Sequence, residues 1–174
     1  MHSLIYYLNL RKKYKPKKVK CIIIAESPPS SGKYFYDNTG LTTEPLFAAL
    51  MKIIKYKPLN KEKEYGLKKF QKKGFYLMDS TYRPIDKLLP KKRNIFIKQS
   101  LNLNKLLLDP KKIRAERIPI LLIKKNVCQI LNPYLAEKSF NVINNGVIVP
   151  FPAYGNQSRF HKIVLSLLRK QKLY

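Results

Sequence analysis

The first residue with both the chemistry and the position of a functional group is Glu26. It directly follows the apolar run 21–25 (Cys-Ile-Ile-Ile-Ala), which is continuous enough to predict a strand buried on both faces. Such a strand belongs to a parallel sheet, and ligands of open α/β sheets bind outside the carboxyl ends of the strands. Pro28, Pro29 and the aromatic run 34–36 follow, so a carboxylate and aromatic rings are predicted at that crevice. A solvated glutamate in an ordinary turn is the alternative interpretation.

A second carboxylate, Asp79, follows the apolar run 75–78 in the same way. Because the carboxyl ends of parallel strands lie at one edge of a sheet, we expect Asp79 and Glu26 to face the same crevice. A structural role in capping a turn is the alternative for Asp79.

The balance of charge indicates a polyanionic partner. The chain of 174 residues has 36 Lys and Arg against 10 Asp and Glu, which gives a formal net charge of +26. Such an excess is typical of domains that bind nucleic acid, where basic side chains neutralise phosphates and release counterions. Compositional drift in an AT-rich genome is the alternative, but drift would enrich acidic residues as well as lysine. We therefore expect a nucleic acid as the partner.

The cysteine and histidine content argues against a metal site or another cofactor. Cys21 and Cys128 are far apart, and with the isolated His2 and His161 they form no set with metal-ligand spacing. Buried thiols in a reducing cytoplasm are expected, with association to the nucleoid if the source is prokaryotic. No apolar run approaches transmembrane length, so no membrane partner is expected. Nothing in the composition demands more than a monomer.

Alternating strand and helix patterns predict a three-layer α/β/α sandwich with a mostly parallel four-stranded sheet. This domain is expected to span residues 19–174, after a basic N-terminal arm over residues 1–18. The third and fourth strands are expected at 118–123 and at 142–149, the latter interrupted by Asn144, Asn145 and Gly146. Helices are expected after Thr42 and Thr43, around Leu67 and Phe70 up to Gly74, over 94–108, after an Asn126 cap, and over 158–173.

With these elements in place, the chain resembles the uracil-DNA glycosylase superfamily, whose fold is a four-stranded parallel sheet between helices. The superfamily's first motif follows the first strand, commonly as Gly-Glu-Ala-Pro-Gly or Gly-Gln-Asp-Pro-Tyr, and residues 25–29 (Ala-Glu-Ser-Pro-Pro) stand there. Its second motif, commonly His-Pro-Ser, precedes the last helix, where residues 151–156 (Phe-Pro-Ala-Tyr-Gly-Asn) stand. Asp79 matches its polar residue at a strand end, and Phe35 matches its base-stacking aromatic.

Several positions depart from the superfamily's pattern. Ala25 replaces the usual Gly, and Pro29 replaces the usual Gly or Tyr. Phe151 stands at the place of the second-motif His, which removes a hydrogen-bond donor to the base carbonyl. The clustered cysteines of the iron–sulfur branches are absent, so no iron–sulfur cluster is expected. These departures are compatible with the fold and bear on the activity.

The resemblance implies a DNA repair enzyme that flips out uracil or another deaminated base and hydrolyses its N-glycosidic bond. Cleavage builds positive charge on the sugar, so Glu26 is expected to stabilise that charge or to activate water, and Asp79 to contact or orient the base. Ser27, Phe35 and Phe151 are expected to bind the base, although ordinary core packing is the alternative for Phe35. Contacts to single- or double-stranded DNA, with Tyr154 as a wedge and the start of the last helix on a phosphate, are expected from Pro28, Lys33, Pro152, Ala153, Tyr154, Gly155, Asn156 and Arg159.

Three functions therefore compete. The first is a DNA glycosylase, for which Glu26 is essential to cleavage. The second is a nucleic-acid-binding protein on the same fold with an inactive or repurposed pocket, which binds DNA without any dependence on Glu26. The third is an enzyme that acts on another nucleotide or nucleic-acid substrate.

Overall fold

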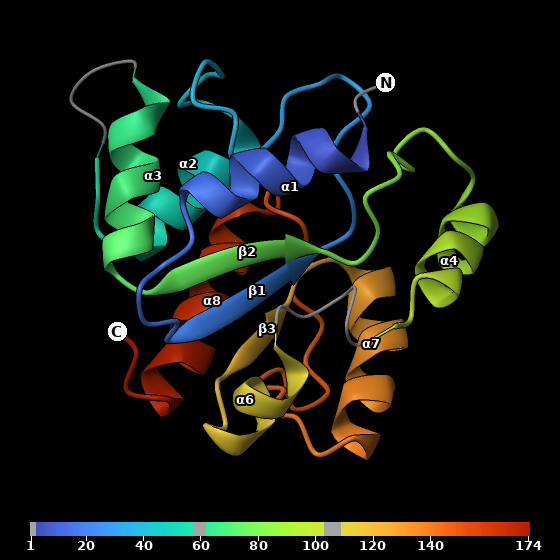
Figure 1. Cartoon of the computed structure of the whole chain (residues 1–174). Helices are drawn as coiled ribbons and strands as arrows, with labels where there is room; N and C mark the ends of the chain where they lie inside the picture. The colour runs from blue at the N-terminus through green and yellow to red at the C-terminus, as the bar shows by residue number, and fades with distance from the viewer. Residues whose placement is uncertain (1–2, 58–61, 103–108) are drawn as a thin grey trace.

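A parallel β-sheet lies at the centre of the protein, for which the computed structural model describes residues 3–57, 62–102 and 109–174 (Figure 1). Strands β1 (Cys21–Ala25), β2 (Phe75–Asp79) and β3 (Ile120–Leu122) are arranged in the order β2-β1-β3. All their residues are buried, as expected for apolar runs covered on both faces. The predicted parallel α/β architecture is therefore confirmed, and the pairing of Ala25 with Asp79 brings the ends of β1 and β2 level.

The prediction of a fourth strand at 142–149 is wrong. Within the described residues the sheet has three strands, and Val142 forms an isolated parallel bridge to Ile120. The side chain of Asn144 takes the place of a strand backbone: its Oδ1 accepts from the Leu122 N–H at 2.7 Å, and its Nδ2 donates to the Leu122 carbonyl at 3.0 Å. Asn145 and Gly146 then turn the chain away with φ angles of 46° and 79°.

Seven described helices surround the sheet. In Figure 1, α8 lies behind β1 and β2, α1 lies on the viewer's side, and α7 flanks β3. None of the described helices combines the length and apolar character needed to cross a membrane. The bounds are α1 Leu4–Lys13, α2 Pro45–Ile53, α3 Lys63–Lys72, α4 Pro90–Gln99, α6 Pro110–Ala115, α7 Lys125–Glu137 and α8 Gln157–Lys170.

The last helix and the helix before Gly74 are present as predicted, whereas several predicted helix starts are wrong. Pro45 lies in the first turn of α2, as predicted from its fit to that position, but the residue before the helix is Glu44 and not one of the two threonines expected as its cap. Helix α4 begins at Pro90, which fits the first turn in the same way, and ends at Gln99, and residues 103–108 of the predicted helix lie outside the described residues. Asn126 lies inside α7, and its side-chain amide serves the site described below.

The segment expected as an arm contains α1, and one side of this helix is buried. Tyr7 and Arg11 of α1 and the following Tyr14 are each no more than 6% exposed. The Tyr14 ring stacks on Tyr36 at 6.0 Å between centroids, and Tyr7 meets Tyr34 edge-on at 4.9 Å. These rings join the same core cluster as β1 and β2, so α1 packs as part of the domain.

Helices α2 and α3 approach closely because Gly66 of α3 has no side chain. A Cβ atom at Gly66 would lie 2.5 Å from Cζ of Phe47 and 2.8 Å from Sδ of Met51, both on α2. Phe47 and Met51 are fully packed, so neither has free space into which it can move. The N-terminal part of α2 borders the cavity described below, which makes this contact a support for the site.

We expect Gly66→Ala to destabilise the protein by about 1–3 kcal/mol through overpacking, even though alanine is intrinsically better in a helix by about 1 kcal/mol. Urea unfolding monitored by circular dichroism measures the difference. Lys69→Ala, at an exposed position of the same helix, is the control and should change stability by less than about 0.5 kcal/mol. If Gly66→Ala were more stable than the wild type, the contact between α2 and α3 would be able to accommodate the added methyl group without strain.

Candidate active site

A cavity of about 770 Å³ opens where β1 and β2 end. Its lining comes from the residues after these strands, from the start of α2 and from the loop before α8. Of the residues predicted from the sequence, ten line it: Glu26, Ser27, Pro28, Lys33, Phe35, Asp79, Phe151, Ala153, Tyr154 and Asn156. The other three, Pro152, Gly155 and Arg159, are not part of this lining, although all three lie in the same loop or in the first turn of α8.

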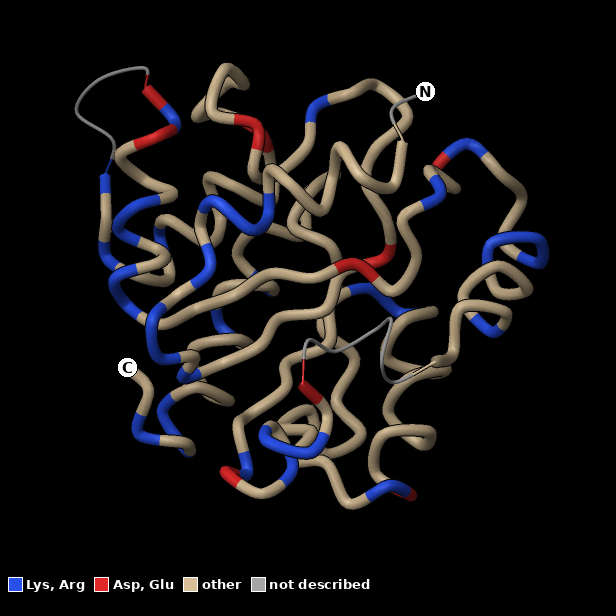
Figure 2. The backbone as a smooth tube through the Cα atoms, viewed as in Figure 1, with Lys and Arg blue, Asp and Glu red and all other residues tan. Residues whose placement is uncertain are grey.

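Glu26 is the most highly coordinated carboxylate of the cavity. It is 6% exposed, and its Oε1 accepts a hydrogen bond of 2.6 Å from the Asn126 side-chain amide. Its Oε2 forms an ion pair with the Lys124 amine and lies 3.9 Å from a terminal nitrogen of Arg93. Figure 2 shows acidic positions side by side at the ends of β1 and β2, with a basic position after β3. The carboxylate is therefore fixed in orientation at the edge of the cavity.

Lys124, Asn126 and Arg93 were not identified as site residues from the sequence. Lys124 and Asn126 follow the end of β3, so the rule that identified Glu26 and Asp79 also applies to them. Arg93 carries no comparable local signal, because it reaches the site from the middle of α4. Its guanidinium also donates to the Leu88 carbonyl at 2.7 Å and to the Asp86 carbonyl. These hydrogen bonds hold the Arg93 side chain against the loop that precedes α4.

Asp79 is buried and incompletely hydrogen-bonded. It is 3% exposed, and its Oδ2 has no hydrogen-bond partner of normal geometry among the described residues. The same holds for the neighbouring Tyr34 hydroxyl, which belongs to a residue that also lines the cavity. Burial raises the pKa of Asp79 to about 7, while the positive charge of Arg11 and the Tyr34 hydroxyl oppose that rise. Asp79 can therefore offer either a proton or an acceptor to a bound molecule near neutral pH.

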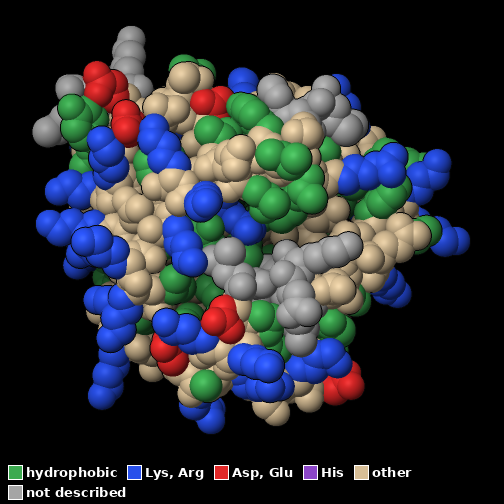
Figure 3. Space-filling model, in the orientation of Figure 1, with side chains coloured by type: hydrophobic (Ala, Val, Ile, Leu, Met, Phe, Trp, Pro, Cys, Tyr) green, Lys and Arg blue, Asp and Glu red, His purple; other side chains and the backbone are tan. Residues whose placement is uncertain are grey.

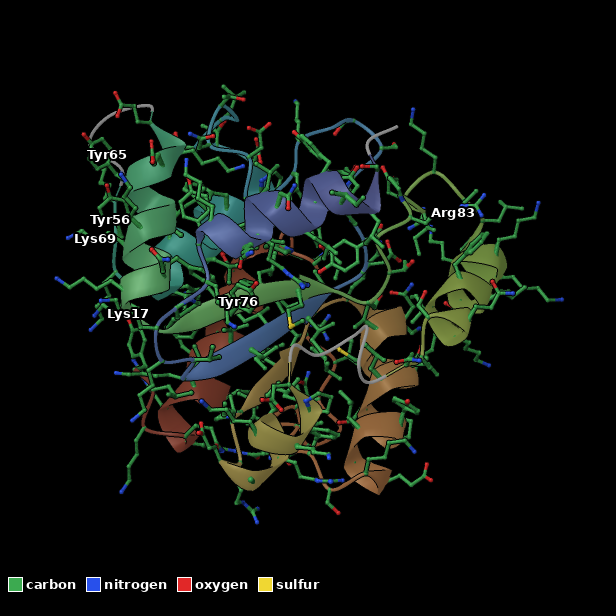
Figure 4. The ribbon with its side chains drawn as sticks, viewed as in Figure 1. Lys17, Tyr56, Tyr65, Lys69, Tyr76 and Arg83 are labelled. Carbon is green, nitrogen blue, oxygen red and sulfur yellow. The ribbon has the colours of Figure 1, made fainter. Side chains whose placement is uncertain are left out.

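Arg11 of α1 supplies the positive charge behind Asp79. Its guanidinium donates to the Tyr82 hydroxyl and lies 5.6 Å from the ring centre of Tyr76 and 5.2 Å from that of Tyr82. Tyr76, labelled in Figure 4, lies on β2. Cation–π contacts of this kind hold a buried guanidinium without a paired carboxylate. Helix α1 thus contributes to the electrostatics of the site from outside the cavity.

The core packing that was the alternative interpretation of Phe35 is confirmed, whereas stacking on a base stays a prediction. Its ring packs in the core at 4.9 Å from Tyr36, 5.3 Å from Phe70 and 5.9 Å from Phe47 between centroids, and it is 5% exposed. It nevertheless belongs to the lining of the cavity. A ring held on three sides presents its remaining surface in one orientation, which suits stacking on a planar group.

A buried ion pair supports the side of the cavity formed by residues 34–44. Lys63 of α3 is completely buried, and its amine donates to Glu44 at 2.7 Å and to the Tyr34 carbonyl at 2.8 Å. Burial lowers the pKa of Lys63, and the Glu44 carboxylate opposes that change. Glu44 also lines the cavity, so the pair joins α3 to the loop that carries Tyr34 and Phe35. No local pattern in the sequence indicated this pairing.

The loop before α8 places Tyr154 at the mouth of the cavity. Tyr154 is 99% exposed and has a φ of 52°, and Gly155 follows with a φ of 80°. The turn is closed by the Asn156 N–H, which donates to the Ala153 carbonyl at 3.1 Å. Asn156 makes no side-chain cap to α8, so the first N–H groups of that helix are available to an anion.

Basic side chains outnumber acidic ones at the molecular surface. Figure 3 shows Lys and Arg at many places on the face that it presents, with fewer Asp and Glu and with hydrophobic side chains between them. In Figure 4, Arg83 lies beside α4, where its guanidinium is 4.3 Å from the ring centre of Phe96. In the described part of the chain, no group of three His, Cys, Asp or Glu side chains is placed to hold a metal ion.

Comparison of the chain with models of protein families, with curated proteins and with solved structures finds no match. The interpretation of the cavity therefore depends on its geometry and chemistry.

The raised pKa of Asp79 predicts a pH-dependent stability. The folded state holds the Asp79 proton up to about pH 7, whereas an unfolded aspartate loses it near its ordinary value of 3.8. The wild type should therefore lose stability relative to Asp79→Asn by roughly 1.4 kcal/mol per pH unit across that interval, and the difference should level off above it. Urea unfolding of both proteins between pH 4 and 8 checks this.

Asp109→Asn is the matched control for the pH series. Asp109 is exposed and caps α6 through a 3.0 Å hydrogen bond from the Lys112 N–H, a role that asparagine also fills. The difference in free energy of unfolding between Asp109→Asn and the wild type should not change with pH in the way expected for Asp79→Asn. If the difference in free energy of unfolding between Asp79→Asn and the wild type also stayed constant from pH 4 to 8, Asp79 would titrate like an exposed carboxylate.

Proposed function

We propose that this protein is a DNA glycosylase that binds a flipped nucleotide in the 770 Å³ cavity and hydrolyses its N-glycosidic bond. The observation that carries the proposal is that two buried carboxylates, Glu26 and Asp79, end adjacent parallel strands and line the same cavity. Hydrolysis of this bond needs a fixed negative charge beside the sugar and a group that recognises the base. The proposal assigns the first role to Glu26 and the second to Asp79.

Glu26 suits the sugar side of the reaction. Positive charge develops on the sugar ring as the bond to the base breaks, and a preoriented carboxylate stabilises it without reorganisation. Asn126 and Lys124 hold the two oxygens of Glu26, so the carboxylate is oriented before the substrate arrives. One oxygen can also accept a proton from the attacking water.

Asp79 suits the base side of the reaction. In its protonated form, a carboxyl group donates one hydrogen bond and accepts another, which complements the adjacent C=O and N–H groups of a deaminated base. The Oδ2 of Asp79 and the Tyr34 hydroxyl have no partner of normal hydrogen-bond geometry among the described residues and interact with each other, so both can re-pair with a bound base. Phe35 presents a rigid aromatic surface for the same base. These features support uracil or another deaminated base as the target.

The surface supports DNA as the carrier of that base. A net charge of +26 favours a polyanion, with Lys33 at the cavity and Arg159 exposed in the first turn of α8. Tyr154, fully exposed at the mouth, can enter the space left by the flipped nucleotide.

A DNA-binding protein with an inactive pocket is the second candidate. Two observations favour it: Phe151 offers no hydrogen-bond donor at the cavity, and the Glu26 carboxylate is already ion-paired with Lys124. This candidate shares the basic surface and the exposed Tyr154 with the first. The two differ in whether the DNA is cleaved at a glycosidic bond and in whether Glu26 matters.

An excision assay with Glu26→Gln separates the two candidates. Labelled oligonucleotides carry uracil, hypoxanthine or xanthine, in single- and double-stranded form, and abasic sites are scored after alkaline cleavage. We expect the wild type to release at least one of these bases and Glu26→Gln to be slower by about a hundredfold or more, because the substitution removes the charge but keeps the shape. DNA binding by Glu26→Gln should be unchanged.

Glu64→Gln provides the control, since Glu64 lies on α3 and pairs there with Lys68 at 3.2 Å. It should excise as fast as the wild type. Salt-sensitive binding to DNA without excision from any substrate would contradict the glycosylase and favour the binding protein. If Glu26→Gln excised the base as fast as the wild type, Glu26 would have no role in the mechanism.

Tyr154→Ala should affect double-stranded substrates selectively. If Tyr154 fills the space of the flipped nucleotide, its loss should slow excision from a duplex by about tenfold, since one stacking contact contributes roughly 1–3 kcal/mol. Excision from a single strand, where no partner base needs replacing, should change little. Tyr65→Ala, at an exposed tyrosine of α3, is the control. An equal loss on both substrates would contradict the role of a wedge.

A further inference from the structure

We propose that the Lys124 amine is a nucleophile that captures the abasic sugar as an imine, so that the protein also cleaves the DNA strand after base removal. This step extends the proposed function and rests on it for the position of the sugar beside Glu26. The inference comes from two independent features of Lys124, its backbone conformation and the placement of its amine.

The backbone of Lys124 adopts a conformation that ordinarily belongs to glycine. Its φ is 87° and its ψ is 139°, a region in which an L side chain is strained. Neighbouring hydrogen bonds impose this conformation: the Lys124 N–H donates to the Val149 carbonyl at 2.8 Å, and the Ile123 N–H donates to the Ile24 carbonyl at 2.9 Å. A glycine would relieve the strain, so a lysine at this position indicates that its side chain has a use.

The Lys124 side chain is placed for chemistry on the sugar. Its amine contacts Oε2 of Glu26, the residue proposed to act beside the sugar, and the side chain lines the cavity at 28% exposure. Lys33 also lines the cavity but is exposed, and no carboxylate of the described residues forms an ion pair with its amine. The adjacent Lys125 is exposed and does not line the cavity. Lys124 therefore combines an amine, a proton acceptor and access to the bound sugar.

The reaction needs no oxidant or metal. Base hydrolysis leaves a sugar whose C1′ opens to an aldehyde. The Lys124 ammonium gives a proton to Glu26, and its lone pair attacks C1′. The carbonyl oxygen then takes one proton from the nitrogen and one from Glu26 and leaves as water, which yields a protonated imine and returns Glu26 to the carboxylate. While Glu26 is protonated, Arg93 retains a positive charge at the carboxyl group.

Strand cleavage follows by elimination. Loss of the C2′ proton to the Glu26 carboxylate gives an enamine, whose electrons form a C2′–C3′ double bond and expel the 3′ phosphate with the C3′–O bonding pair. Water then hydrolyses the imine, releases an unsaturated aldehyde on the 5′ fragment and restores the Lys124 amine. The water released on imine formation is balanced by the water consumed on hydrolysis, Glu26 passes the C2′ proton to solvent, and no net redox change occurs.

Trapping with borohydride on a preformed abasic site tests the proposal. The substrate is a labelled single-stranded oligonucleotide whose abasic aldehyde has been made in advance, so base excision is not required. Sodium cyanoborohydride reduces an imine to a stable amine, and the wild type should give a covalent protein–DNA adduct that peptide mass spectrometry locates at Lys124. Without the reductant, the strand should be cut on the 3′ side of the abasic site.

Two variants of Lys124 keep the test independent of folding. Lys124→Arg retains the positive charge facing Glu26 but cannot form the imine, and Lys124→Gly fits the backbone conformation without strain. Both should lower adduct formation by about a hundredfold or more, with thermal unfolding and abasic-DNA binding measured in parallel. Lys125→Arg is the matched control and should form the adduct at the wild-type rate.

The outcomes separate this proposal from the proposed function. Adduct formation at Lys124 supports the imine step, even if the protein excises no base. Excision of a base without any adduct from bound abasic DNA would overturn the imine step and leave the glycosylase standing. An adduct that maps to another amine, or that persists in Lys124→Arg, would also overturn it.

Discussion

The burial of β1 between two parallel neighbours is the constraint on which the rest of the structure depends. Because β2 and β3 run in the same direction as β1, all three strands end at one edge of the sheet. At that edge Glu26 follows β1, Asp79 is the last residue of β2, and Lys124 lies two residues beyond β3, so groups from distant parts of the chain come together. Hydrophobic burial of the strands thus provides the energy that brings two carboxylates and an amine together, a juxtaposition that is electrostatically demanding on its own.

The cost of burying a carboxyl group is offset differently for Glu26 and Asp79. Glu26 is compensated directly, by Lys124, Asn126 and Arg93. Within the described residues, Asp79 has no partner of normal hydrogen-bond geometry at Oδ2 and keeps its proton to a higher pH, with the charge of Arg11 and the Tyr34 hydroxyl opposing that shift. The two acids therefore differ in environment, one facing cations and the other buried with its proton, which suits the proposed pairing of a cationic sugar with a neutral base.

Local patterns in the sequence were sufficient for the buried strands, for α8 and for the two acids at strand ends. They failed at 142–149 because the pattern of apolar residues does not reveal that an asparagine side chain replaces a strand backbone. They also missed Lys63 and Arg93, since an ion pair between residues far apart in the chain leaves no periodic signal. Lys124 could have been predicted as a site residue from its place after β3, but its strained backbone could be seen only in the structure.

The buried residues that line the cavity are held more firmly than the exposed residue at its mouth. Phe35, Glu44 and Asp79 are fixed by core packing or by a buried ion pair, which limits their motion when a ligand binds. Tyr154 is exposed on a turn with two successive positive φ angles and has no comparable restraint. A rigid interior favours recognition of one planar group by shape and hydrogen bonding, whereas an adaptable rim can meet a phosphate backbone of varying geometry. In the proposed glycosylase, this division assigns selectivity for the base to the buried residues and affinity for the polymer to the exposed ones.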